Sequence, residues 1–333
     1  MKASFIRRTG TPDVIEYGDL PEPECGAKQV RIAVHSVAVN PVDTYIRGGA
    51  NYWPLPMPFI IGCDMAGEVV EVGAEVSDVS LGQRVWCTNQ GLLGRQGTFA
   101  QQVVVDPQWL NLIENNVSYD DAASTALVAV TAHLGLFREA NLLPGQTVFI
   151  VGGTGGVGSM VVQMAAAFGA RVITTGGSAE KVQRCYELGA DVAINYKQVD
   201  LQQALLDATD GAGVNVFWET RREPNFDFAT AVLAQRGKMI LMAGRDARPE
   251  FPVGPFYVKG CSIHGFVMFK ATADEMRVCG ADISQWLSNG KLKSQIAMKL
   301  PLSEAKRAHQ IQEASTTHQD GSLAGKIVLN PAL

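Results

Sequence analysis

The sequence predicts an α/β protein with two domains, a doubly wound parallel sheet and an N-terminal β-barrel. Its length of 333 residues suits about two domains. After Ser124, short apolar segments typical of strands alternate with helical segments, which favours a parallel sheet covered by helices on both faces. Before Ser124, short strand-like segments are separated by Gly and Pro, which is typical of an all-β barrel.

We assign residues 124–299 to the doubly wound domain, and residues 1–123 and 300–333 to the barrel. The expected strands of the doubly wound domain are Thr147–Val151, Arg171–Thr175, Val192–Asn195, Val214–Trp218, Lys238–Ala243 and Ser262–Val267. Helices are expected between most of them, for example at Met160–Phe168, Ala179–Leu188, Asp200–Ala208 and Phe226–Leu233.

The barrel strands are predicted from shorter sequence patterns than the strands of the doubly wound domain. Val30–Val34 alternates with period two, as a half-buried strand does. The segment from Asn51 to Pro56 lies where Gly and Pro are dense and is expected to be a loop. The apolar tail Gly325–Leu329 is expected to be one more strand, which returns to the barrel. Further barrel strands are expected at Gly67–Val72, Gln83–Trp86 and Thr98–Val105.

Composition excludes several classes of partner. The net charge of −5 argues against nucleic acid or an anionic membrane surface. No apolar run approaches the length of a membrane span, and the N-terminus leads into a strand and not into a signal peptide. The six cysteines are scattered without a C-x-x-C pair, which suits reduced thiols in a cytoplasmic protein.

The glycine-rich segment 148–159 predicts a dinucleotide site. Gly153, Gly155 and Gly158 have G-x-G-x-x-G spacing directly after an apolar strand and before an apolar helix. Such glycines permit a tight turn, close approach of the backbone to a pyrophosphate, and close packing of helix and strand, while the helix N-terminus attracts the anion. The expected contacts in this loop are Gly153, Thr154, Gly155, Gly156, Val157 and Gly158.

Single residues exclude two other kinds of site that contain glycine-rich turns. A Walker-type P-loop needs Lys after Gly158, where this chain has Ser159. A nucleophile elbow needs G-x-S-x-G, and the segment 176–180 ends in Glu180 instead of glycine. The sequence therefore indicates neither an NTPase nor a serine hydrolase.

Two N-terminal motifs carry a resemblance to a known family. The segment 62–73, GCDMAGEVVEVG, looks like the G-H-E-x-x-G-x-V-x-x-V-G signature of the medium-chain dehydrogenase/reductase superfamily. The segment 39–49, VNPVDTYIRGG, closely resembles the zeta-crystallin-like quinone oxidoreductases. The resemblance implies a GroES-like barrel domain, a Rossmann domain, and a homodimer formed through the edge strand at 261–269, whose long apolar edge needs a cover.

The chain departs from the zinc-dependent members of that superfamily. Catalytic zinc needs three protein ligands. Cys63, Asn40 and Leu127 stand where the resemblance places those ligands, and a lone Cys63 cannot hold the metal. Closely spaced cysteines for a structural zinc are missing too, with only Cys87 near that region. We therefore expect a zinc-free enzyme in which Cys63 is a small buried thiol.

The end of the second strand of the doubly wound domain indicates NADPH. An acidic residue that would bind the ribose 2′-OH of NAD is missing after Arg171–Thr175. Gly176 leaves room for a phosphate, Ser178 can donate a hydrogen bond, and Lys181 supplies charge, although Lys181 could equally be a solvated helix residue. The resemblance adds Tyr196 to this group and Thr131 at the nicotinamide end. An arginine that some relatives place near residues 314–316 is missing. Arg245 follows a later strand end, where ligands bind in such sheets.

Without zinc, hydrogen bonds must polarise the substrate carbonyl. Asn40 offers an amide N–H and Tyr45 a phenolic O–H, and the resemblance places both near the nicotinamide. Tyr52 lies on the loop expected at the rim of the pocket. In the alternative interpretation, Asn40 caps a turn and Tyr45 packs on Trp53. Asp43 is expected to brace this loop.

The sequence thus predicts an NADPH-dependent, zinc-free reductase of quinones or related conjugated carbonyls. An enone or alkenal double-bond reductase is the alternative within enzymes, and a nucleotide-binding structural protein without turnover is the alternative outside them. The adjacent Arg221 and Arg222 could approach the cofactor or substrate, or form surface salt bridges. The substrate itself stays open.

Overall fold

The computed structural model describes residues 1–50, 53–316 and 323–333, which form two compact units. We call Met1–Val130 with Ala271–Leu333 the barrel unit, and Thr131–Lys270 the sheet unit. The sequence placed these divisions at 123/124 and 299/300. In the structure they fall at 130/131 and 270/271, and the later one differs more because the segment after Lys270 packs on the barrel.

The sheet unit contains one six-stranded parallel sheet with the strand order β11-β10-β9-β12-β13-β14. Numbered along the chain within this unit, the order is 3-2-1-4-5-6, which is the doubly wound Rossmann arrangement. The α/β fold class predicted from the sequence is therefore confirmed. The strands are β9 (Thr147–Ile150), β10 (Arg171–Gly176), β11 (Val192–Asn195), β12 (Val214–Glu219), β13 (Leu233–Leu241) and β14 (Ser262–Gly265).

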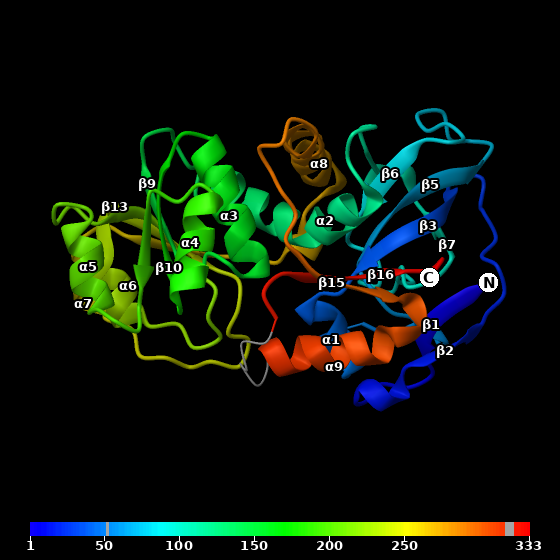
Figure 1. The fold of residues 1–333 in the computed structure, drawn as a ribbon, viewed down its shortest axis with the longest axis horizontal. Coiled ribbons are helices and arrows are strands. Elements are labelled where there is room, and N and C mark those ends of the chain that lie inside the picture. The colour runs from blue at the N-terminus through cyan, green and yellow to red at the C-terminus, as the bar shows by residue number, and fades with distance from the viewer. Residues whose placement is uncertain (51–52, 317–322) are drawn as a thin grey trace. The chain divides into compact units, whose positions relative to one another are not determined.

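Helices connect these strands, as the alternating pattern predicted (Figure 1). They are α3 (Gly156–Ala167), α4 (Ala179–Glu187), α5 (Leu201–Asp207), α6 (Phe226–Val232) and α7 (Val253–Val258). A core of buried side chains, with the partly buried Phe228 packed against it, joins sheet and helices. Phe149 of β9 and Phe217 of β12 lie 5.3 Å apart between ring centroids, and Phe217 lies 5.7 Å from Phe228 of α6. Burial of such large aromatic side chains is a main source of stability for this unit.

Two strands of the sheet unit differ from their predicted bounds by more than one residue. β13 begins at Leu233 and not at Lys238, because Leu233 is buried and pairs with Val214 before the register shifts. β14 ends at Gly265, since Phe266 turns away from the ladder and packs edge-on against Trp218 at 6.5 Å. β14 is the last strand of the sheet, as expected. The homodimer predicted through this edge stays a prediction.

The barrel unit is built from two sheets. The larger has the order β15-β16-β3-β5-β6-β8, with β7 also paired to β3, and the smaller has the order β2-β1-β4. The C-terminal strand does return to the barrel, where Val328 pairs with Ala38. The strands are β1 (Lys2–Ile6), β2 (Glu16–Asp19), β3 (Val30–Ala38), β4 (Phe59–Ile60), β5 (Asp64–Val72), β6 (Arg84–Cys87), β7 (Gln102–Val105), β8 (Asn111–Leu112), β15 (Ile296–Pro301) and β16 (Lys326–Asn330).

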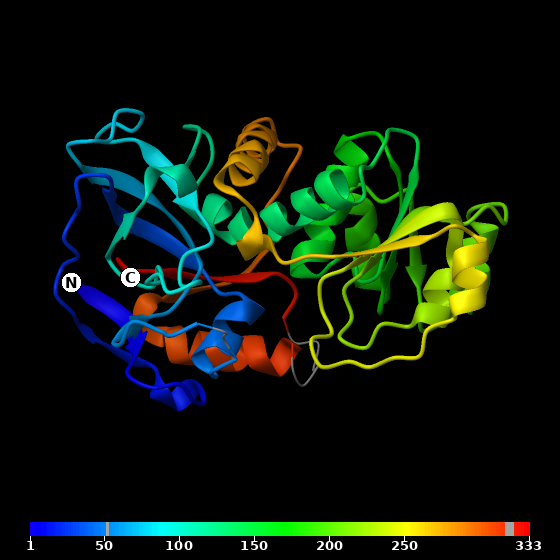
Figure 2. The same ribbon diagram turned by 180° about the vertical axis from the view of Figure 1, so that it is seen from behind.

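Helices α1 (Pro41–Arg47) and α9 (Ala305–Thr316) lie side by side in both views of the barrel unit (Figures 1 and 2). The chain enters the sheet unit within α2 (Tyr119–His133) and returns before α8 (Ala273–Ser288). Among the described residues, no helix is long and apolar enough to cross a membrane.

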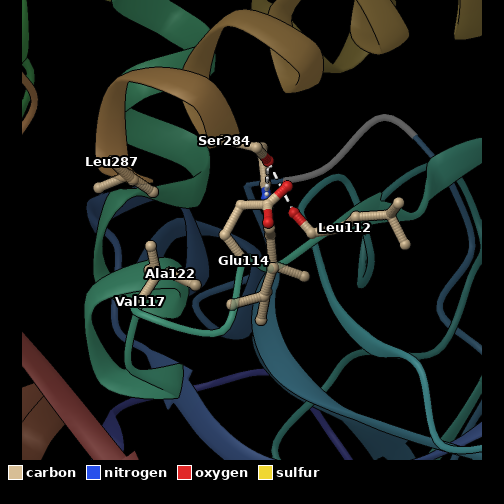
Figure 3. Close-up of a pocket in the computed structure, with 8 residues that line it drawn as sticks. Leu112, Glu114, Val117, Ala122, Ser284 and Leu287 are labelled. Atoms are coloured by element: carbon tan, nitrogen blue, oxygen red, sulfur yellow. Dashed lines mark hydrogen bonds between the residues drawn. The ribbon is translucent and has the colours of Figure 1, made fainter. Parts of the chain in front are cut away.

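Helix α8 belongs to the barrel unit because its side chains bond to barrel strands. Ser284 Oγ donates to the Leu112 carbonyl oxygen at 2.8 Å and accepts from Trp86 Nε1 at 3.0 Å. Figure 3 shows Ser284 hydrogen-bonded to the Leu112 backbone, with Leu287, Val117 and Ala122 around a small hollow, and the space between the lining side chains does not admit a water molecule. This hollow is therefore packing space and not a ligand site.

Candidate functional site

The glycine loop follows β9, and three of its glycines have a distinct steric reason. Gly152 has a φ of +76°, a left-handed conformation that favours glycine. A Cβ on Gly158 would lie 2.2 Å from the Gly152 carbonyl oxygen, and one on Gly153 would lie 2.4 Å from Thr174 Oγ1. The tight turn therefore falls on Gly152, one position before the G-x-G-x-x-G pattern, and the sequence had not selected that residue.

Neighbouring strands hold this loop at the centre of the sheet. The Gly152 N–H donates to Thr175 Oγ1 at 2.9 Å, and Thr220 Oγ1 donates to the Val151 carbonyl at 2.6 Å. These bonds tie the end of β9 to the ends of β10 and β12, where the strand order reverses. Helix α3 starts at Gly156, and the first N–H groups of a helix have no acceptor within it. The loop therefore fits a pyrophosphate, which needs donors and close backbone approach.

A second group of predicted residues meets at the ends of β10 and β11. Gly176 is in register with Asn195, so Tyr196 follows directly beside Gly177. A Cβ on Gly177 would lie 2.8 Å from the Tyr196 hydroxyl oxygen. Ser178 Oγ caps α4 by accepting from the Lys181 N–H at 3.3 Å. The fold thus brings Gly176, Ser178, Lys181 and Tyr196 together and adds Gly177, which the sequence had not selected.

At the end of β12, Arg221 has an ion-pair partner. Its guanidinium binds both carboxylate oxygens of Glu219, with Nη2 to Oε2 at 2.6 Å and Nε to Oε1 at 3.0 Å. Glu219 is 1% exposed, so Arg221 pairs with a buried carboxylate at the carboxyl ends of the strands, where the glycine loop also lies.

The remaining cofactor candidates lie in the same unit. Arg245 is exposed and follows Gly244, whose φ is +82° and whose Cβ would lie 2.5 Å from the Arg222 carbonyl oxygen. The turn carrying Arg245 therefore lies against the segment after β12. Thr131 is buried in α2. Contacts of Arg245 and Thr131 with a cofactor stay predictions.

In the barrel unit, Asn40 is the centre of a buried polar cluster. We define this cluster as Asn40, Asp43, Cys63, Asp64 and Lys326, all of which are buried. Asn40 Nδ2 donates to Asp64 Oδ2 at 2.7 Å, and Asn40 Oδ1 accepts from Lys326 Nζ. The backbone N–H of Asn40 donates to Asp43 Oδ2 at 2.7 Å, so Asp43 braces the start of α1 as expected. Both ends of the Asn40 amide are therefore engaged within the protein.

Burial shifts the pKa of every titratable member of this cluster. Desolvation raises the pKa of Asp43 to about 7. Desolvation also raises the pKa of Asp64, against the opposing effect of Lys326, and lowers the pKa of Lys326. The pKa of the Cys63 thiol is raised by burial and then by the neighbouring Asp43 and Asp64, so Cys63 is a neutral, buried thiol as predicted.

Of the two predicted tyrosines of the barrel unit, the described residues include only Tyr45. Tyr45 lies in the second turn of α1 and is half-buried. Tyr52 lies outside the described residues. The sequence had selected neither Asp64 nor Lys326, although a signal existed for each, because Asp64 follows Cys63 in the family motif and Lys326 begins an apolar strand.

The positions that matched zinc ligands carry a different set of groups. Asn40 and Cys63 belong to the buried polar cluster, and Leu127 lies in α2. Within the part of the chain that the structure describes, there is no group of three or more His, Cys, Asp or Glu residues placed to hold a metal ion.

Comparisons with known proteins extend over nearly the whole chain. A family model described as alcohol dehydrogenase GroES-like domain matches residues 26–115, and one described as zinc-binding dehydrogenase matches residues 156–281. A relative from Nematostella vectensis, named quinone oxidoreductase-like protein 2 homolog, is 32% identical over 99% of this chain and 88% of its own length.

Solved structures share the fold and differ in the activity that they name. An NAD-dependent alcohol dehydrogenase superimposes with a TM-score of 0.89 at 28% identity, covering 99% of both chains. A mycobacterial protein in complex with NADPH has a TM-score of 0.84 at 28% identity, covering 99% of this chain and 100% of its own. A 2-haloacrylate reductase has a TM-score of 0.84 at 26% identity and covers 100% of both chains.

Proposed function

The chain belongs to the quinone oxidoreductase branch of the medium-chain dehydrogenase/reductase superfamily, and we propose that it is a zinc-free, NADPH-dependent reductase of quinones or related conjugated carbonyls. The observation that carries this proposal is the group at the end of β10. Gly177 packs against Tyr196, and Ser178 caps the helix that presents Lys181. A 2′-phosphate would meet a cation, hydroxyls and space for its oxygens, and no carboxylate stands at the strand end.

NADPH is held by two features of the sheet unit. The glycine loop and the start of α3 take the pyrophosphate, and Lys181 with Ser178 and Tyr196 takes the 2′-phosphate. When bound, NADPH supplies the hydride that reduces the substrate. The likeness to a mycobacterial structure containing NADPH supports this cofactor, whereas the alcohol dehydrogenase structure names NAD. The chain's own strand end, which lacks the acidic residue, favours NADPH.

Tyr45 is the best candidate to polarise the substrate carbonyl. Its hydroxyl can donate to an oxygen that gains negative charge as the hydride arrives. Asn40 donates from Nδ2 to Asp64 at 2.7 Å and only distantly to the Ala38 carbonyl, at 3.4 Å. Asn40 therefore contributes chiefly by fixing the start of α1, and Tyr45 supplies the donor. Tyr52 is retained as a candidate at the rim.

The direct test is a screen of NADPH oxidation without oxygen. Purified protein is mixed with benzoquinones, naphthoquinones, enones and alkenals, with NADH in parallel. We expect turnover of at least one quinone or enone, with NADPH preferred over NADH. Tight NADPH binding without turnover of any substrate in the screen would support the structural, non-catalytic alternative instead.

Tyr45→Phe tests the donor assignment, because it removes one hydroxyl and keeps the ring. We expect kcat to fall while the NADPH dissociation constant is unchanged. Loss of a donor in a well-formed oxyanion site raises the activation free energy by about 2.7–4 kcal/mol. An easily reduced quinone needs less polarisation, so we expect a smaller loss than this. The loss should be larger with an enone than with a quinone. An unchanged kcat with both substrates would make Tyr45 a packing residue.

Double-bond reduction is the second candidate, supported by the likeness to a 2-haloacrylate reductase. It uses the same cofactor and differs in where the hydride is delivered. Product identification by NMR separates the two activities. A hydroquinone supports the first proposal, and an enone saturated at its carbon–carbon bond supports the second.

A further inference from the structure

Lys326 is a buried ammonium group for which the proposed reaction has no role so far. It begins β16, is 5% exposed, and is followed by the fully apolar Ile327, Val328 and Leu329. Its Nζ donates to the Val39 carbonyl at 2.7 Å and to Asn40 Oδ1. An ammonium is costly to bury unless its surroundings compensate its charge, so a buried lysine with such specific partners needs an explanation.

Asp64 supplies the opposite charge on the other side of the same amide. Its Oδ2 accepts from Asn40 Nδ2 at 2.7 Å. The carbonyl end of the Asn40 amide thus faces an ammonium, and the amino end faces a carboxylate. Rotation of the amide by half a turn would place N–H against the ammonium and oxygen against the carboxylate. The two charges therefore allow only one orientation of this side chain.

The sheet topology explains why these residues meet. β16 and β5 are the two neighbours of β3 at its end, and both run antiparallel to it. The start of β16, the end of β3 and the start of β5 therefore lie side by side. Lys326 is the first residue of β16, Asp64 is the first of β5, and Asn40 follows β3 and directly precedes α1.

We propose that Lys326 is a positioning residue that, together with Asp64, clamps the Asn40 amide and so fixes the start of α1, which carries Tyr45. The proposal rests on the proposed function, since it gives Tyr45 its place as donor. The clamp joins residues 286 positions apart in the chain, so it also ties the C-terminal strand β16 to the start of α1.

The electrostatics of the cluster agree with this geometry. Burial lowers the pKa of Lys326, while Asp64 and then Asp43 raise it. Burial raises the pKa of Asp64, and Lys326 is the largest influence in the opposite direction. The lysine and the aspartate each offset part of the effect of burial on the other's pKa, as expected for two charges that share one bridging amide.

The test compares a single and a double variant. Lys326→Met removes the ammonium and leaves Asp64 unbalanced, so both stability and kcat should fall. Lys326→Met combined with Asp64→Asn removes both charges and keeps the volume, so much of the stability should return. The Asn40 amide is then no longer held by opposite charges, so kcat should stay at least about tenfold below wild type while the KM for NADPH changes less than about twofold.

Lys259→Met is the matched control. Lys259 Nζ donates to the carbonyls of Thr230, Ala231 and Leu233 in the sheet unit, so it is also a lysine with several backbone partners. Its loss should lower the unfolding midpoint and leave kcat per folded molecule unchanged. Recovery of kcat together with stability in the double variant would show that Lys326 is structural only and would overturn the proposal.

A second readout does not depend on turnover. The side-chain amide protons of Asn40, assigned by NMR, should exchange slowly with solvent in the wild type and at least about tenfold faster in the double variant. Unchanged exchange would overturn the clamp even in an active enzyme. If the wild type turns over no substrate in the screen, the proposed function fails, and the exchange rates still decide whether the clamp exists.

Discussion

The two units build their candidate ligand-binding sites in different ways. In the sheet unit, the site is built largely from missing side chains, because Gly152, Gly153, Gly158 and Gly177 leave space that any Cβ would fill or a φ that other residues avoid. In the barrel unit, the site depends on buried polar side chains around Asn40. The first kind of site follows from local sequence, and the second requires distant segments to meet.

The largest expected effect comes from filling the space in the glycine loop. Gly158→Ala places a Cβ 2.2 Å from the Gly152 carbonyl oxygen, and backbone atoms must move to accept it. We expect NADPH affinity to fall by about 100-fold or more, which corresponds to about 2.7 kcal/mol. Isothermal titration calorimetry measures this loss directly.

Gly254→Ala is the control for that experiment. Gly254 lies in α7 of the same unit, and a Cβ there would meet nothing within 4 Å. NADPH affinity should be unchanged. If Gly158→Ala also binds NADPH normally, the loop is not built on missing side chains, and the contrast between the units fails.

The next effect concerns a buried histidine of the barrel unit. His309 of α9 is fully buried against Phe99, and neither ring nitrogen has a hydrogen-bond partner among the described residues. Burial, with a smaller contribution from Arg47, lowers the pKa of His309 from 6.5 to about 3. Below pH 6.5 the unfolded chain therefore binds a proton that the folded chain refuses, so stability falls as pH falls.

Between pH 7.5 and 4.5 this histidine should reduce the unfolding free energy by about 2–3 kcal/mol. His309→Leu should remove that part of the pH dependence, as measured by urea unfolding at both pH values. His35→Leu is the control, because His35 is exposed and stacks on Tyr119. A slope that persists in His309→Leu would show that other groups of the barrel unit cause it.

A smaller effect tests the nucleotide preference of the sheet unit. Lys181→Ala should weaken NADPH binding by about 1–2 kcal/mol, near the strength of a charge-assisted hydrogen bond, and should leave NADH nearly unchanged. Arg184→Ala, further along α4, removes an exposed cation and should affect neither nucleotide. Equal losses for NADPH and NADH with Lys181→Ala would mean that Lys181 does not bind the 2′-phosphate.

The smallest effect separates two roles of Ser178. Ser178→Ala removes the cap of α4 and should lower stability by about 0.5–1 kcal/mol. Ser178→Asp retains a good cap, so stability should match the wild type, while its charge should repel a 2′-phosphate and shift preference towards NADH. Thermal unfolding and nucleotide titrations measure the two roles independently. Retained NADPH preference in Ser178→Asp would place Ser178 outside the phosphate site.

Much of the fold was predictable because its signals are local. The apolar segments that became β9 to β12 were found to within one residue at each end, since buried parallel strands are continuous apolar runs bounded by turns. The start of β13 was not found, because Leu233 begins a strand directly after a helix and no turn residue marks the change. The assignment of α8 to the barrel depended on contacts with Trp86 and Leu112, which its own sequence does not indicate.

The candidate site divides in the same way. Glycine spacing, the missing acidic residue after β10 and the Asn40–Tyr45 motif are each contained in short segments, so the sequence by itself determined the dinucleotide fold and the family, and it predicted NADPH as the cofactor. Only the tertiary structure decided that the Asn40 amide is engaged by Asp64 and Lys326, and that Gly152 takes the tight turn. The physical reason is the separation in sequence over which each interaction acts. Steric and helix-terminal requirements act between neighbours in the chain. Buried charges are compensated by residues from distant strands that the fold brings beside them.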